Sequence, residues 1–226
     1  MQSITKLFNE EIYPRLSKLG FKKASNKKFV YLSDEGVVAE ISTELRTDTI
    51  KRFYISISIA SVYERLSLMP MIVGGKFPDL KIGQAYNANS DEIIKLSIGY
   101  IIDHYENKFK YWLENAISHQ GYMNLLIEVQ NKNDVTSKNG WSKWALATGH
   151  LSKGQISDAK KYAELAIIDF KKNLDLNPSA IWPKDGILKC EHILRASIDE
   201  IAINEYLRES KKISILNLNL EDLLSK

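Results

Sequence analysis

The sequence contains a single cysteine, Cys190, among 226 residues. An internal disulfide needs two thiols, so none can form, and a reducing, cytoplasmic compartment is the expected environment. Long apolar runs are missing too, since no stretch reaches the roughly 18 residues of a membrane-spanning helix. Residues 1–16 form an amphipathic segment with acidic residues and lack the apolar centre of a signal peptide. We therefore expect a cytoplasmic protein that does not contact a membrane.

An excess of charge of one sign is also absent. Lysine and arginine together number 31, aspartate and glutamate 28, and the formal net charge is +3. This nearly equal number of positive and negative charges does not by itself favour nucleic acid as a partner. Hydrophobic residues make up 44% and charged residues 26% of the chain, as in ordinary globular proteins, and the length permits one large or two small domains.

Motifs typical of catalytic or metal centres are missing as well. No HExxH, CxxC, GxSxG or dinucleotide-binding glycine pattern occurs, so the sequence predicts no catalytic residue, no metal and no cofactor. Cys190 and His192 are two residues apart in a helical pattern and therefore point in different directions. The Val-Gly-Gly-Lys run at 73–76 lacks two positions of a phosphate-binding loop and is interpreted as a turn. An enzyme is thus less expected than a non-catalytic protein.

A long central helix is predicted from Ser90 to Ile117. Its apolar residues recur every three or four positions and define one face. They are Ile94, Ile98, Ile101, Tyr105, Phe109, Trp112 and Ala116. Ser90 is a suitable N-cap for this helix. The chain before it is β-rich and the chain after it is helical, so we expect an α+β fold with regions 1–89 and 90–226, which can also pack as one domain.

The first region combines a helix with an antiparallel sheet. Residues 3–19 predict a helix that Pro14 kinks or restarts and Gly20 ends. Strands are predicted at 29–33, 37–45 and 53–59, with turns at 34–36 and 47–49, and the last strand alternates most clearly. The sheet has three or more strands, with one face covered by the first and central helices. Segment 66–89 is a long connection, read either as a crossover or as a functional loop.

The second region predicts a helical bundle. Helices are expected at 122–130, 141–151, 157–174 and 185–212, with a polar break at 131–140. The apolar stripe of the last helix contains Ile187, Leu194, Ile198 and Ile201. The tail at 215–224 fits a strand and a docked helix equally well.

Two stretches resemble known families. The segments Pro14-Arg15-Leu16 and Leu19-Gly20-Phe21-Lys22-Lys23, followed by Phe29 and the 53–59 strand, resemble an uncharacterised bacterial family catalogued as a domain of unknown function. That resemblance covers roughly the first quarter of the chain and implies an α+β region without known catalytic residues. The second set, Leu146, Ala147, His150, Gly154, Ala159 and Ala166, resembles one tetratricopeptide-like helix pair. Ala163 and the late Asn177-Pro178 depart from that repeat, so a single helical hairpin is implied.

Two groups of residues are candidates for partner binding. Trp141, Trp144 and His150 lie on the predicted 141–151 helix, and tryptophan is frequent both at interface hot spots and in cores. Lys22, Lys23, Lys27 and Lys28 are flanked by aromatic residues, a pattern that suits phosphate backbones as well as a solvated surface. Glu40 and Glu44 share a strand face, where a solvated surface and an acid–base pair are alternatives.

Three functional hypotheses follow from these patterns. The first is a non-catalytic binding protein, an immunity- or inhibitor-type partner of another bacterial protein, because folding signals are strong and catalytic signatures are missing. The second is an enzyme with an unrecognised site near the 66–89 loop. The third is a nucleic-acid-binding module that uses the Lys22–Lys28 cluster. A protein partner is favoured over nucleic acid.

Overall fold

The structure, a computed structural model, describes residues 4–47, 51–67, 73–76, 86–132 and 139–221. The chain forms two compact units. The sheet unit comprises residues 1–59 and 74–118, and the helical unit comprises residues 60–73 and 119–226. This division differs from the one expected at residues 89 and 90, because the long helix after Ser90 belongs with the sheet. The predicted α+β class is confirmed.

Among the described residues, the sheet unit holds a six-stranded sheet with the order β1-β2-β3-β4-β5, in which β6 also pairs with β4. The strands are β1 Lys22–Ser25, β2 Lys28–Leu32, β3 Val37–Thr47, β4 Lys51–Ser61, β5 Val73–Lys76 and β6 Tyr86–Asn87. The three predicted strands correspond to β2, β3 and β4. The Val-Gly-Gly-Lys run, predicted as a turn, is strand β5. The predicted turn at 47–49 and much of segment 66–89 lie outside the described residues.

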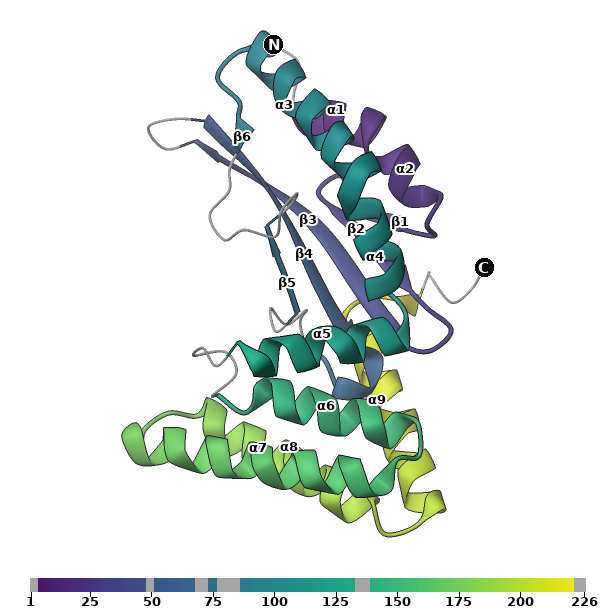
Figure 1. Cartoon of the computed structure of the whole chain (residues 1–226), viewed down its shortest axis with the longest axis vertical. Helices are drawn as coiled ribbons and strands as arrows, with labels where there is room; N and C mark the ends of the chain where they lie inside the picture. Colours follow the sequence, from purple (N-terminus) through teal and green to yellow (C-terminus); the bar gives the residue numbers. More distant parts are fainter. Residues whose placement is uncertain (1–3, 48–50, 68–72, 77–85, 133–138, 222–226) are drawn as a thin grey trace. The chain divides into compact units, whose positions relative to one another are not determined.

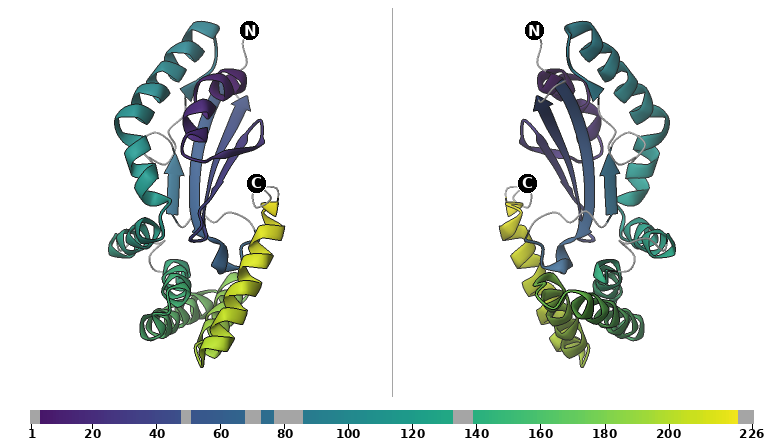
Figure 2. Two further views of the ribbon diagram at one scale, coloured as in Figure 1. Left: turned by 90° about the vertical axis from the view of Figure 1, so that its right-hand side faces the viewer. Right: turned by 90° about the vertical axis from the view of Figure 1, so that its left-hand side faces the viewer.

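Alternating side chains fix which face of the sheet is buried. Phe29 pairs with Ile41 across β2 and β3, so both side chains lie on the same face. The Phe8 ring of α1, Ile4–Glu11, lies 5.7 Å from the Phe29 ring and 5.8 Å from the Phe53 ring. The ribbon views place α1 and the long central helix that follows Ser90 on the same side of the sheet (Figures 1 and 2). The predicted cover of one face is thus confirmed.

The first helix is interrupted where proline predicts an interruption. Helix α1 ends at Glu11, and the short α2, Tyr13–Ser17, begins with Pro14 at its first turn. Proline lacks the backbone donor that a continuous helix needs, but it suits a first turn. Gly20 follows with a φ of +89°, a left-handed conformation that glycine adopts without strain. The predicted restart and end are confirmed.

The central helix forms one continuous helical rod with a wider turn in its middle. It consists of α3 Asp91–His104, a π-helical turn at Tyr105–Phe109 and α4 Lys110–Ala116. Because a π turn contains one extra residue, the core position predicted for Trp112 is taken by Leu113, which is fully buried. Trp112 is instead half-buried and stacks on Phe109.

The helical unit consists of a short 3₁₀ turn and successive packed helices (Figure 1). These are η1 Val62–Glu64, α5 His119–Asn131, α6 Trp141–Ser152, α7 Ile156–Leu176, α8 Trp182–Ala196 and α9 Glu200–Asn217. Gly154, with a φ of +70°, makes the tight turn between α6 and α7. Both helices of this hairpin meet through small buried residues, including Ala147, Ala159 and Ala166.

The single helix predicted over 185–212 is wrong, because the chain turns between α8 and α9. Asp199 adopts an extended conformation and its carboxylate accepts a hydrogen bond from the Ala202 amide at 2.8 Å, which starts a new helix. Ile198 and Ile201, predicted in the apolar stripe, are 76% and 80% exposed. The buried stripe of α8 runs through Gly186, Cys190, Ile193 and Ala196 instead.

Candidate functional site

A tight corner follows strand β4 and begins the candidate site. The Ser61 hydroxyl accepts from the Tyr63 amide at 3.3 Å, and the Glu64 carboxyl accepts from the Ser61 amide at 3.0 Å, so the two side chains form a reciprocal capping box. Arg65 then takes a left-handed conformation with a φ of 48°. For a residue other than glycine this conformation costs roughly 1–2 kcal/mol, so its surroundings must hold it in place.

Arg65 is held by helix α9. Its Nε donates to the Ser210 hydroxyl at 3.0 Å, and its Nη2 donates to the Glu209 carboxylate at 3.1 Å. The guanidinium also lies 4.8 Å from the centre of the Tyr206 ring, within the range of a cation–π contact. Three side chains, one turn or one residue apart on the same helix, thus fix a strained residue that is far away in the sequence.

The next residue continues this attachment. The Leu66 amide donates to the Ser214 hydroxyl at 2.7 Å, and the Asn217 side chain donates to the Leu66 carbonyl at 3.0 Å. Both backbone groups of Leu66 are therefore satisfied by side chains of α9. The corner at residues 61–66 is a docked segment whose place depends on α9.

Two substitutions at Arg65 should separate the stability contributed by its side-chain contacts from the stability lost to its left-handed backbone. Arg65→Ala removes the hydrogen bonds and keeps the left-handed backbone, so we expect a loss of about 2 kcal/mol in unfolding free energy. Arg65→Gly removes the same contacts but relieves the strain, so it should be more stable than Arg65→Ala by about 1 kcal/mol. Urea unfolding followed by circular dichroism measures both losses. Equal stability of the two variants would contradict a strained Arg65.

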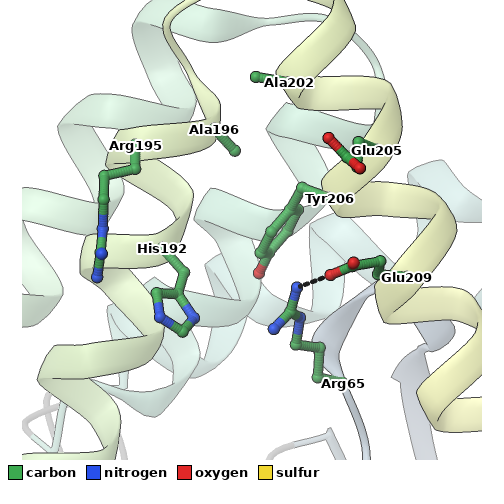
Figure 3. Close-up of a pocket in the computed structure, with 8 residues that line it drawn as sticks. All are labelled: Arg65, His192, Arg195, Ala196, Ala202, Glu205, Tyr206 and Glu209. Atoms are coloured by element: carbon green, nitrogen blue, oxygen red, sulfur yellow. Dashed lines mark hydrogen bonds and ion pairs between the residues drawn. The ribbon is translucent and has the colours of Figure 1, made fainter.

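A groove lies between α8 and α9, with Arg65 at one end (Figure 3). Its cavity measures about 450 Å³. The residues that line this α8–α9 groove are Arg65, His192, Arg195, Ala196, Ala202, Glu205, Tyr206 and Glu209. The α8 wall carries the basic side chains and the α9 wall carries the acidic ones. The groove is therefore divided into two faces of opposite charge.

Protonation and ion pairing reduce this division of charge to Arg195 on one wall and Glu205 on the other. Burial, with help from the nearby Arg195 and Arg65 charges, lowers the pKa of His192, so its imidazole is uncharged at pH 7. Burial raises the pKa of Tyr206 to about 12, so the phenol keeps its proton. Glu209 is paired with Arg65. Arg195 and Glu205 are mostly exposed. Arg195 lies 3.9 Å from the Glu191 carboxylate and donates to the Glu191 carbonyl at 3.4 Å, and Glu205 lies 4.0 Å from Arg208. Such exposed pairs within one helix are weak, so each charge can accept an external partner.

A second buried polar cluster lies behind the corner. Glu64 is 0% exposed, and its Oε1 accepts hydrogen bonds from the Tyr122 hydroxyl at 2.6 Å and from the Ser61 amide. Burial raises the pKa of this carboxyl from 4.5 to about 7, although both hydrogen bonds and the Lys189 charge act in the opposite direction. The other oxygen, Oε2, is buried without a hydrogen-bond partner.

The lone cysteine does not reach the groove. Cys190 is fully buried on α8, and burial raises the pKa of its thiol to about 12, so it is not an activated nucleophile. His192, two residues later, lines the groove, as the predicted divergence of the two side chains requires. Within the described ranges, no group of three histidine, cysteine, aspartate or glutamate residues is placed to hold a metal ion.

The aromatic candidates on α6 take part in the packing of the helical unit. Trp144 is 4% exposed, which leaves little of its ring for a partner. Trp141 is half-buried and packs edge-on against the Phe170 ring at 5.0 Å. His150 stacks on the Tyr162 ring at 5.2 Å and has a hydrogen bond of 2.6 Å to Gln155. These three side chains do not line the α8–α9 groove.

The lysine candidates gather on the β1–β2 hairpin of the sheet unit. Lys23 and Lys27 are exposed, Lys22 is half-buried, and Lys28 forms an ion pair of 3.0 Å with Glu40. In addition, the Glu44 carboxylate is paired with Arg46 at 2.8 Å. Since Glu40 and Glu44 each have their own cation, they do not form an acid–base pair.

The chain matches no protein-family model, no curated protein and no solved structure. Its own residues are therefore the basis for any assignment of function. None of the helices in the described part of the chain has both the length and the apolarity that a membrane span requires.

Sequence patterns did not point to the groove. Arg65 is separated from the α9 residues that hold it by more than 140 positions, so no local spacing reveals the contact. One local signal exists: Ser61 and Glu64 have the spacing of a capping box, which marks a turn at this place. A second is the pair Ser210 and Ser214 on one face of a helix, where serine is otherwise uncommon.

Proposed function

We propose that this chain is a non-catalytic binding protein, of the immunity or inhibitor type, that holds another protein in the α8–α9 groove. The observation that carries the proposal is the charge arrangement of the groove. Arg195 and Glu205 extend from opposite walls, while Arg65 and Glu209 neutralise each other at one end. A partner segment with an acidic side chain towards Arg195 and a basic side chain towards Glu205 complements these walls.

The surface next to the groove supports a protein partner over a small molecule. Glu205 also borders a second hollow of about 360 Å³ that is lined by Ile201, Asn204 and Arg208. Ile201 is 80% exposed and follows the equally exposed Ile198 in the turn between the two helices. Exposed apolar side chains beside charged ones are typical of protein interfaces. Together the two hollows offer a wider contact area than a small ligand needs.

Catalysis is the less favoured function, because the reactive groups are withdrawn from the groove. The Cys190 thiol and the Glu64 carboxyl are both fully buried. Nucleic-acid binding through the lysine cluster is favoured less as well, since Lys28 is neutralised by Glu40. The remaining exposed lysines, Lys23 and Lys27, provide few of the phosphate contacts that give strong salt dependence.

Charge reversal at the groove tests the proposal. Arg195→Glu should weaken the complex with the native partner about tenfold or more, because it places like charges against the acidic side of the partner. The partner is captured from native-host extract with the full chain, identified, and titrated against each variant. Lys23→Glu, an equally exposed reversal in the sheet unit, should leave the affinity unchanged.

Other outcomes would overturn the proposal. Equal affinity for wild type and Arg195→Glu would exclude the α8–α9 groove as the binding surface. If Lys23→Glu lost binding and Arg195→Glu did not, the lysine cluster would be the binding surface. Failure to capture any stoichiometric protein would contradict a binding protein of this class.

A further inference from the structure

The corner at residues 61–66 is docked through a carboxyl group that water does not reach. Glu64 accepts two hydrogen bonds at Oε1, one from the Tyr122 hydroxyl on α5 and one from the Ser61 amide. Its Oε2 atom is buried and has no hydrogen-bond partner. Because Oε2 has no donor to stabilise a negative charge, burial of the neutral carboxyl costs less here than burial of the ionised carboxylate.

Among the described residues no cation forms an ion pair with Glu64, although the Lys189 charge favours its ionised form. The ionisable groups that interact with Glu64 are Tyr122 on α5, Lys189 on α8 and Tyr206 on α9, and Arg65 follows it in the corner. The Lys189 ammonium lies 3.9 Å from Asp185 and 5.3 Å from the Trp144 ring, and the Arg65 guanidinium is engaged by Glu209. Helix α6, which also packs against η1, carries the buried Trp144 indole NH, which has no partner either.

The position of Glu64 links its proton to the groove. Arg65 and Leu66 follow it directly, and both are attached to α9 by hydrogen bonds. If Glu64 moves towards water, the corner must move with it, and the Arg65 contacts at the end of the groove are released. The left-handed strain at Arg65 lowers the cost of that release.

We propose that the 61–66 corner is a proton-controlled latch, docked on α9 while Glu64 carries its proton and increasingly open once the carboxylate forms. The raised pKa of Glu64, about 7, places this change in the physiological range. Because the latch depends only on contacts within the helical unit, it does not rest on the proposed binding function. Its consequence for that function is control of one end of the groove by pH.

Hydrogen exchange measures the latch in the full chain. With a pKa near 7 in the docked state and 4.5 in water, the opening constant of the corner should rise about 50-fold between pH 5 and pH 7.5. Rates are corrected for the chemical pH dependence of exchange. The reporters are the Ser61 and Leu66 amides, both bonded to side chains in the docked state. At pH 7.5 they should exchange at least tenfold faster than amides in the buried middle of α7.

The isosteric Glu64→Gln is the matched control, since its amide oxygen can accept the same two hydrogen bonds and cannot ionise. Once exchange rates are corrected for their chemical pH dependence, the opening constant of the corner in this variant should not change with pH. Tyr122→Phe is a second variant, which removes one of the bonds that hold the carboxylate and should increase opening at pH 7.5. Two results would overturn the latch: a pH-dependent corner in Glu64→Gln, or equal exchange of the corner and the α7 amides in wild type.

Discussion

Replacing Phe170 by alanine is expected to lower the unfolding free energy of the helical unit by about 3–5 kcal/mol. The ring is fully buried on α7 and packs edge-on against Trp141 at 5.0 Å and Trp182 at 6.2 Å. Removal of the ring therefore loses apolar burial and two aromatic contacts at once, and leaves a cavity between α6, α7 and α8. Urea unfolding followed by far-ultraviolet circular dichroism measures the loss without relying on the tryptophans involved.

The close approach of α8 to the Phe170 ring gives this prediction a stringent test. A Cβ atom added at Gly186 would lie 2.4 Å from the ring, so Gly186→Ala alone should destabilise the protein by about 1–3 kcal/mol through overpacking. In the Phe170→Ala background the obstacle is gone, and the same glycine change should cost far less. The two losses should therefore not add, and the interaction energy should reach about 1 kcal/mol or more.

A control on the same helix separates packing from helix propensity. Ile168 lies two residues before Phe170 and is 47% exposed, so Ile168→Ala should change stability by less than about 1 kcal/mol. If Phe170→Ala cost as little as this control, or if the Gly186 and Phe170 losses were additive, the central packing role of Phe170 would be contradicted.

The sheet was largely predictable, because apolar side chains recur at every second position in the sequence of β4, although the structure buries almost every residue from Phe53 to Ser61. Phe53, Ile55 and Ile57 are nearly fully buried, as their period of two indicates. The short strands β1, β5 and β6 escaped prediction, since two to four residues carry no readable period. Strand β1 in addition reads Lys-Lys-Ala-Ser, a polar sequence whose place is determined by its partner β2.

Helix faces were predicted less well than helix positions, since local irregularities shift the period. The π turn at Tyr105–Phe109 moves the buried position from Trp112 to Leu113. The turn before Asp199 likewise removes Ile198 and Ile201 from the core. Asp199 followed directly by Glu200 is a signal for the start of a helix. Apolar residues nevertheless continue at helical spacing across this point, and that spacing predicts one uninterrupted helix.

The candidate groove was not predictable, because its residues are distant in the sequence and its chemistry depends on burial. Arg65 looks like a surface residue in the sequence, and only the fold shows that α9 holds it in a left-handed conformation. Similarly, Glu64 has the spacing of a capping residue, and nothing in the local sequence shows that the helices bury it completely. The tryptophans predicted to bind a partner, by contrast, include Trp144, which is buried in the core.

The stability of the helical unit is expected to fall as pH rises from about 4.5 to about 7. The pKa of Glu64 is about 7 in the folded chain and 4.5 as its ordinary value, so the folded state holds the proton more tightly. The resulting stabilisation is complete below pH 4.5, declines as pH rises, and is lost above pH 7. A difference of 7 − 4.5 pKa units corresponds to about 3 kcal/mol.

Glu64→Gln isolates the contribution of Glu64 from that of every other ionisable group in the chain, because the substitution changes this one side chain only. The variant should have a much flatter stability profile between pH 5 and pH 7.5. It should be more stable than wild type by about 3 kcal/mol at pH 7.5, because ionisation of Glu64 destabilises the docked corner of the wild type. Urea unfolding at each pH gives the unfolding free energy of both proteins, and the change of their difference with pH is the contribution of Glu64 ionisation. Parallel profiles would show that Glu64 ionises normally, which would contradict the buried, partly unsatisfied carboxyl at the 61–66 corner.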